Sequence, residues 1–228
     1  MPSVDLATTP LRDLNAALHA LSLDTPDTHW TVTNPRGRHS VAVGVAVPVT
    51  VEVAGHVGYY CAGMNERATI IVAGSAGVGV AENMMSGRVH VKGDASQAAG
   101  ATGRGGLLVI DGNASARCGI SMKGIDIVVK GNIGPMSAFM AQAGRLVVLG
   151  DAGDALGDSI YEARLYVRGA VKSLGADCIE KPMREEHHAE LRALLDAADL
   201  ADVPTTAFRR YGSGRTLYNF HVDNAAAY

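Results

Sequence analysis

Glycine recurs at an unbroken interval of 19 residues through most of this chain. Seven copies follow one another, at Gly55, Gly74, Gly93, Gly112, Gly131, Gly150 and Gly169. A repeat of fixed length is typical of proteins in which one structural unit stacks on the next, because equal spacing brings equivalent residues into contact. The interval therefore predicts a solenoid of seven equal coils.

The residues in front of each glycine alternate between apolar and polar character. The columns two and four positions before the glycine are wholly aliphatic: Val53, Val72, Val91, Ile110, Val129, Val148 and Val167, and Val51, Ile70, Val89, Leu108, Ile127, Leu146 and Leu165. The column directly before the glycine contains four charged residues, Lys92, Asp111, Lys130 and Arg168. Alternation with a period of two is typical of a half-buried strand. Each coil is therefore predicted to carry one β-strand before its glycine.

The residues after each glycine predict turns and corners. A mostly polar column follows at once: His56, Ser75, Asp94, Asn113, Asn132, Asp151 and Ala170. An inward-facing column then runs from Val57 to Val171, and a column of only alanine and glycine runs from Ala62 to Ala176. Polar residues promote turns, and small residues fit tight corners. We therefore predict an all-β fold, a single-stranded β-helix (β-solenoid) over residues 41–180 with seven coils of 19 residues.

The segments on either side of the repeat predict short helices. Thr9 and Pro10 suit a helix N-cap and first turn, and leucines then share one helical face: Leu11, Leu14, Leu18 and Leu21. Residues 184–198 read as a second helix, with acidic residues at its start. Exposed strand edges invite aggregation, so both flanks are expected to cap the solenoid. The chain divides into residues 1–40, 41–180 and 181–228.

The C-terminal tail, from residue 207 onward, is predicted to be irregular. Residues 208–220 bring two of the three phenylalanines together with three arginines. Aromatic residues and arginine are common at the centres of protein interfaces. The sequence leaves two alternatives open, because this run either packs back on the solenoid or docks on a partner subunit.

Charge and cysteine usage narrow the class of protein. A formal net charge of -3 gives no electrostatic reason to expect nucleic acid or an anionic membrane as a partner. The chain does not open with a signal-peptide pattern, and its longest apolar stretch, residues 41–53, is too short to span a bilayer. We expect a cytoplasmic protein. Cys61 and Cys118 form no CxxC pair with each other or with Cys178, and both are expected to be buried thiols.

Motifs that suggest chemistry have simpler structural explanations. Residues 69–79 look like a strand entering a nucleotide-binding glycine loop, but their glycines belong to the 19-residue register and no GxxxxGK[ST] motif is present. The histidines show no metal-ligand spacing, and His187 and His188 are expected to lie on a solvated helix face. We therefore predict no catalytic, cofactor-binding or metal-binding residue in this chain.

The best copies of the repeat contain further glycines, as in Gly150, Gly153 and Gly157, with partial copies at Gly55 and Gly58 and elsewhere. This pattern resembles the GXGXG domain, the β-helical C-terminal domain of the large subunit of glutamate synthase, which also occurs as a separate chain of formylmethanofuran dehydrogenase. The resemblance covers residues 41–180 and implies a right-handed β-helix. The family's matching residues are the repeat glycines, and their role is structural.

The tail from Phe208 to Asn224 is similar to that of free-standing glutamate synthase-like subunits. The resemblance implies a hetero-oligomer of three chains: an amidotransferase-like subunit, an FMN-binding synthase subunit and a GXGXG subunit. In glutamate synthase the nucleophilic cysteine, the FMN and the iron-sulfur cluster belong to other domains. We therefore expect this chain to be a non-catalytic scaffold subunit without a cofactor of its own. One such complex is N-methylglutamate synthase (methylamine-glutamate N-methyltransferase), which joins methylamine to glutamate and releases ammonia.

Other functions remain alternatives at this point. The chain could serve a glutamate synthase or a complex like formylmethanofuran dehydrogenase. A left-handed β-helix acyltransferase is an enzymatic alternative, although such solenoids repeat in hexapeptides and would give 18 residues per coil. A self-assembling structural solenoid is the third, but its ends should be uncapped.

Overall fold

The computed structural model describes residues 1–215 of the chain. Eleven strands form one sheet in the order β1-β2-β3-β4-β5-β6-β7-β8-β9-β11-β10. The elements are β1 (Ser3–Asp5), α1 (Leu11–His19), β2 (His29–Thr33), β3 (Thr50–Val53), β4 (Thr69–Val72), β5 (Arg88–Val91), β6 (Leu107–Ile110), β7 (Lys123–Val129), β8 (Ala143–Val148), β9 (Arg164–Val167), β10 (Cys178–Lys181), α2 (Glu185–Ala197), the 3-10 helix η1 (Thr205–Ala207) and β11 (Arg209–Ser213).

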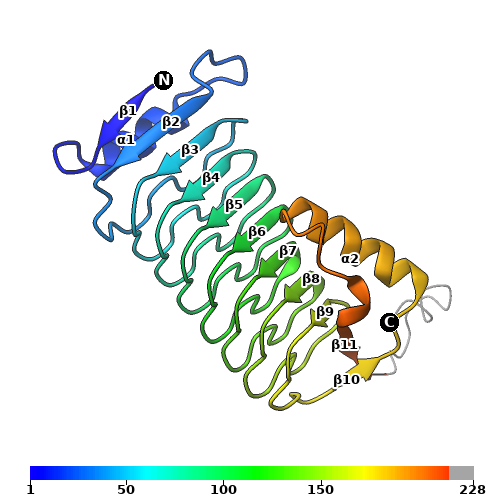
Figure 1. Cartoon of the computed structure of the whole chain (residues 1–228). Coiled ribbons are helices and arrows are strands. Elements are labelled where there is room, and N and C mark those ends of the chain that lie inside the picture. The colour runs from blue at the N-terminus through cyan, green and yellow to red at the C-terminus, as the bar shows by residue number, and fades with distance from the viewer. Residues whose placement is uncertain (216–228) are drawn as a thin grey trace.

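The central strands stack in parallel as successive coils of a rod (Figure 1). From β3 to β9 the hydrogen-bonded partners lie 19 residues apart, as in Val51 with Ile70 and Val89 with Leu108. One irregularity occurs, between Lys123 and Asp126 of β7, where the pairing with β8 shifts. The predicted β-solenoid and its register are therefore confirmed.

The two aliphatic columns form the core of the rod. All fourteen of their side chains are fully buried. The third inward column pairs from coil to coil through single parallel bridges, from Val57 with Ala76 to Ala152 with Val171. Like residues thus stack along three lines, because each coil repeats the conformation of the one before it.

The segment from four to eleven residues after each repeat glycine, here called the corner segment, has an alternating backbone. In the coil that follows Gly93, Ala98, Gly100 and Thr102 have φ of 59°, 67° and 55°. Their N–H groups point alternately to the two neighbours: Ala98 donates to the next coil at Ala116, and Gly100 donates to the previous coil at Val80. The column of alanine and glycine predicted to form tight corners occupies the middle of these three positions.

The repeat glycines are required by close packing between coils. A Cβ built on Gly112 would lie 2.9 Å from the carbonyl carbon of Gly93, and one on Gly131 would lie 2.7 Å from the carbonyl oxygen of Gly112. Both distances are shorter than a real Cβ contact allows. Among the seven glycines Gly55 has a positive φ, of 145°, so close approach and not backbone conformation explains the column.

Helix α1 closes the N-terminal end of the rod, as expected for a cap. Leu14 and Leu18 are buried against the first coil. Asn15 Nδ2 donates to the carbonyl of Ser40 at 2.9 Å, and His19 Nε2 donates to the carbonyl of Val43 at 2.6 Å. These side chains satisfy carbonyl groups that have no further coil to pair with. The helix begins at Leu11 with Pro10 as its N-cap, one residue later than predicted.

The C-terminal flank differs from the prediction in two ways. Helix α2 lies along the outer face of the sheet and not across the end of the rod (Figure 1). Its buried Leu191, Leu194 and Leu195 pack on a column of the sheet face, three positions before each glycine: Val109, Val128, Val147 and Tyr166. The end is covered instead by part of the tail predicted to be irregular, since β11 pairs antiparallel with both β9 and β10.

Candidate interaction surface

The three cysteine thiols are buried, and burial governs their chemistry. Cys61 and Cys118 are fully enclosed, and desolvation raises the pKa of each thiol to about 12. Burial, with Asp158 nearby, also raises the pKa of Cys178 to about 12. A thiol must lose its proton to act as a nucleophile. These side chains are therefore core residues, as predicted for Cys61 and Cys118.

The glycine-rich segment that resembled a nucleotide-binding loop is part of the stacked coils. A Cβ on Gly77 would lie 2.5 Å from the carbonyl carbon of Gly58, and one on Gly74 would lie 2.8 Å from that of Gly55. Both glycines are thus in contact with the preceding coil. Gly77 N–H donates to the carbonyl of Val57 at 3.0 Å, so this backbone pairs within the solenoid. That the segment binds no phosphate stays a prediction.

His187 is not on a solvated face, contrary to the prediction. It is buried, and its Nδ1 accepts a hydrogen bond from the N–H of Arg184 at 3.1 Å, so it caps α2. Burial and the nearby Arg210 cation lower the pKa of His187. His188 contacts Thr205 through its Nδ1 at 3.0 Å. His187 is buried because the apolar contacts of α2 with the sheet orient the start of the helix toward the tail.

A network of charged side chains attaches α2 to the sheet. Glu190 of α2 accepts hydrogen bonds from Arg164 at 2.6 Å and from the hydroxyl of Tyr166 at 2.5 Å. Arg145 lies 3.4 Å from the same carboxylate and binds Asp126 through two nitrogens, each at 2.6 Å. Burial raises the pKa of Asp126 although Arg145 opposes this. The network attaches the helix to this face, and its carboxylates and arginines pair with one another.

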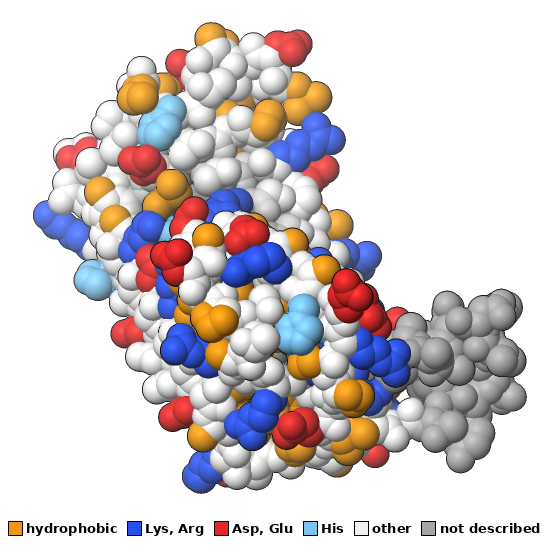
Figure 2. Space-filling model, turned by 45° about the vertical axis from the view of Figure 1, so that its right-hand side comes forward, with side chains coloured by type: hydrophobic (Ala, Val, Ile, Leu, Met, Phe, Trp, Pro, Cys, Tyr) orange, Lys and Arg blue, Asp and Glu red, His pale blue; other side chains and the backbone are white. Residues whose placement is uncertain are grey.

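A second charged cluster lies on the same sheet face. His90 Nε2 and Lys130 Nζ lie 2.9 and 2.8 Å from Asp111 Oδ1, and Lys92 is near its other oxygen. Burial opposes the ionisation of Asp111, but the hydrogen bonds from Lys130 and His90 outweigh it and lower the pKa of the carboxyl. Figure 2 shows charged side chains of both signs on the side of the molecule that carries α2. The charged side chains within these two clusters therefore pair with one another on the sheet face that carries α2.

The exposed apolar side chains gather on a different side, along the corner segments. Within residues 1–215 ten large hydrophobic side chains are exposed, and seven of them lie on corner segments when Ile179, which belongs to strand β10, is left aside. They fall into two groups. The N-terminal patch consists of Tyr59, Met64, Val78 and Met85, and the C-terminal patch consists of Met140, Tyr161 and Leu174 with the half-buried Met136 and Phe139.

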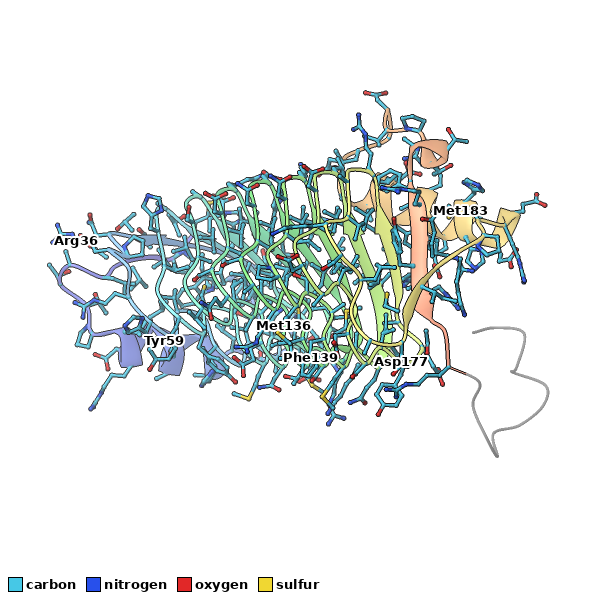
Figure 3. The ribbon with its side chains drawn as sticks, turned by 90° about the horizontal axis from the view of Figure 1, so that it is seen from below. Arg36, Tyr59, Met136, Phe139, Asp177 and Met183 are labelled. Carbon is cyan, nitrogen blue, oxygen red and sulfur yellow. The ribbon has the colours of Figure 1, made fainter. Side chains whose placement is uncertain are left out.

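The two patches are separated along the rod by coils with a different surface. The corner segments between them carry the exposed cations Arg104, Arg117 and Lys123. In Figure 3, Tyr59 of the N-terminal patch and Met136 and Phe139 of the C-terminal patch lie along the lower side of the rod. Exposed apolar patches bounded by polar residues are typical of protein interaction sites. The corner side is therefore the candidate interaction surface.

Metal-binding groups and membrane-spanning helices are both absent from the described part of the chain. Among residues 1–215, three or more histidine, cysteine or acidic side chains nowhere come together in a group that could hold a metal ion. In the same part of the chain neither helix is long and apolar enough to cross a membrane.

Comparison of the sequence with known proteins identifies the family of this chain. Protein GlxC from Rhizobium meliloti (strain 1021) is 68% identical over 228 residues, which cover 100% of both proteins. The chain belongs to the GlxC family. No family model matches the sequence, so the resemblance to the GXGXG domain is carried by the repeat described above.

In this GlxC family member, two surfaces were not predicted from the sequence: the sheet face that α2 covers and the apolar patches on the corner segments. A sequence pattern for the first of them was present. The column three positions before each glycine changes from Glu52, Ile71 and His90 to Val109, Val128, Val147 and Tyr166. That change marks where α2 covers the sheet. Exposed methionines and tyrosines on the corner segments gave no such signal, because the columns that contain them together hold mostly polar residues in the other copies.

Proposed function

We propose that this chain is the non-catalytic scaffold subunit of a glutamate synthase-related flavoenzyme. The observation that carries the proposal is the pair of apolar patches on one side of a rigid rod, in a member of the GlxC family. The glycine repeat supports it through its resemblance to the GXGXG domain. In this function each patch contacts one partner, so that an amidotransferase-like subunit and an FMN-binding synthase subunit are held at a fixed separation.

The more specific proposal is that the complex is a cytoplasmic N-methylglutamate synthase. The reaction would take place in the partner subunits, with the FMN and an iron-sulfur cluster bound there. This chain would contribute rigidity, because every coil is bonded to both neighbours along the strand, the third inward column and the corner. Its buried thiols, whose pKa is raised, are poor nucleophiles and are consistent with a structural role.

The test is co-purification of the tagged chain with partners expressed from its own host, followed by mass spectrometry and a flavin absorption spectrum. An FMN-containing synthase chain should be recovered in a fixed ratio. Met64→Asp with Val78→Asp should release one partner, and Met140→Asp should release the other, because a buried carboxylate opposes association. Leu23→Asp is the matched control, since Leu23 is 58% exposed but lies outside both patches.

Two results would contradict the proposal. The first is that no flavin-containing chain is recovered with the wild-type protein. The second is that the patch variants, shown to be folded by their melting temperature, retain every partner as well as the Leu23 control does. Methylamine-dependent activity of the purified complex, compared with ammonia-dependent activity, tests the N-methylglutamate synthase assignment separately.

A further inference from the structure

A pocket lies at the N-terminal end of the rod, where its lining residue His39 contacts Tyr59 of the N-terminal patch. It has a volume of about 570 Å³ and lies between the segment that joins β1 to α1 and the loop that follows β2. Leu6, Ala7 and Leu11 form its apolar wall. Arg36, Gly37, Arg38 and His39 form the opposite wall, and Figure 3 labels Arg36 at this end of the molecule. The size is within the range of small-molecule sites.

The polar side chains that line this pocket carry hydrogen-bond donors. The guanidinium groups of Arg36 and Arg38 carry two positive charges. His39 adds a third donor, because its Nδ1 accepts the N–H of Tyr59 at 3.0 Å and its proton is therefore on Nε2. Within residues 1–215 the Arg38 side chain makes no hydrogen bond or ion pair. Two arginines without carboxylates in the lining favour an anion.

The carboxylate of Asp5 interacts with Arg36 but is not part of the pocket lining. Asp5 accepts hydrogen bonds at 2.8 Å from the N–H of Ala7 and from Asn34 Nδ2. These bonds, with a smaller contribution from Arg36, lower the pKa of Asp5. The carboxylate is thus held by the backbone and by Asn34, outside the pocket lining. The lining therefore contains two cationic side chains and no carboxylate.

The backbone that carries these donors is held to the first coil. Gly37 N–H donates to His56 at 3.0 Å, and Gly58 N–H donates to the carbonyl of Arg38 at 2.7 Å. The ring of His39 stacks on Tyr59 with the centroids 4.2 Å apart. The loop is therefore fixed before any ligand arrives, and a fixed loop lowers the entropic cost of binding.

We propose that this pocket binds a small aliphatic dicarboxylate. Each guanidinium can form a two-pronged pair with one carboxylate, and two negative charges offset the repulsion between the two cations. The methylene groups of such a ligand would lie on Leu6, Ala7 and Leu11. A single carboxylate would leave one guanidinium unpaired, and inorganic phosphate would leave the apolar wall uncovered.

The experiment is a titration of the isolated full-length chain with succinate. Binding is measured by calorimetry and by the NMR signals of the Arg36–His39 amides. Acetate and inorganic phosphate are titrated in parallel. We expect saturable binding that is strongest for succinate and weakens as salt is added. Arg36→Ala and Arg38→Ala should each weaken it about ten-fold, the effect of losing one charge-assisted pair. Arg168→Ala is the control, an exposed arginine on the sheet face outside the pocket.

Each alternative result overturns the proposal. Absence of saturable succinate binding would show that the pocket is not a site for this class. Equal or tighter binding of phosphate would assign it to another anion, and equal losses in the Arg168 variant would indicate a general charge effect. Unchanged melting temperatures of the variants show that folding is not the cause. The titration needs no partner subunit, so its failure leaves the scaffold function standing.

Discussion

The backbone N–H of Asn113 donates a 2.7 Å hydrogen bond to the Oδ1 of Asp94, the residue at the same position of the preceding coil. The same bond recurs along the polar column, from Ser75 donating to His56 at 2.9 Å to Ala170 donating to Asp151 at 2.7 Å. These side chains do more than promote turns. They form a ladder that supplies an acceptor for one N–H in each coil.

The ladder predicts a specific effect of removing one acceptor. Asp94→Ala should lower the free energy of unfolding by about 1 to 2 kcal/mol, because the N–H of Asn113 then loses its partner. Asp94→Asn keeps an oxygen at the same place and should restore most of the loss. Urea denaturation measures both. Equal destabilisation by the two variants would mean that the charge of Asp94, and not the hydrogen bond, is what matters.

The glycine column predicts a stronger effect. In Gly112→Ala the new methyl group would meet Asp94 Oδ1 and the carbonyl of Gly93, the latter at 2.9 Å, so two coils must separate. We expect a loss of more than about 2 kcal/mol in the free energy of unfolding. Gly212→Ala is the matched control, since its nearest atom would be 3.6 Å away. Similar denaturation midpoints for the two variants would contradict the close-packing explanation.

Glu190 predicts how firmly α2 is held. In Glu190→Ala, the cations of Arg145 and Arg164 and the hydroxyl of Tyr166 lose their shared partner, whose side chain is only 15% exposed. The attachment of α2 should weaken by roughly 2 to 4 kcal/mol. Hydrogen exchange at Leu191 and Leu194 should accelerate accordingly.

The control for Glu190 is an exposed ion pair of the same helix. Asp196 pairs with Arg192 at 3.1 Å and is 52% exposed, so Asp196→Ala should cost no more than about 0.5 kcal/mol. Comparable exchange rates in the two variants would show that the apolar contacts alone hold the helix.

The buried thiols predict a loss of stability in alkali. The pKa of Cys61 and Cys118 rises from 9.0 to about 12 on burial. Between these values the unfolded chain loses the proton and the folded chain keeps it, so stability falls as the pH rises above 9. At pH 10 each thiol should contribute a loss of about 1 kcal/mol. The measurement is the urea midpoint at pH 8 and pH 10.

The double variant Cys61→Ala with Cys118→Ala tests the origin of that loss. Its stability should depend less on pH over this interval than that of the wild type, although its stability at pH 8 is lower because methyl groups replace buried sulfur atoms. An unchanged pH dependence would show that other groups are responsible.

The solenoid could be predicted because its determinants are local and repeated. Residues such as Val89 and Leu108 are 19 positions apart, and each copy independently predicts the same strand, turn and corner. The N-terminal helix could also be predicted, since Leu14 and Leu18 share one helical face. The lack of candidate catalytic residues is an expectation from motifs, and it stays a prediction.

The pocket and the path of the C-terminal flank could not be predicted in the same way. Arg38 and Leu6 lie on opposite walls of one pocket but far apart in the sequence, and no repeat marks either of them. The strand at Arg209–Ser213 forms because β9 offers an unpaired edge. Its own sequence, which contains Gly212, has little tendency to form a strand.

The sequence by itself determined the coil length, the register and the columns that face the core, because equal spacing leaves one way to stack like residues. The tertiary structure decided where α2 lies, which edge β11 covers and which loops meet around the N-terminal pocket. Val109, Val128, Val147 and Tyr166 become one apolar surface only when their coils are stacked. Contacts of this kind depend on distances between segments, and those distances exist only in the folded chain.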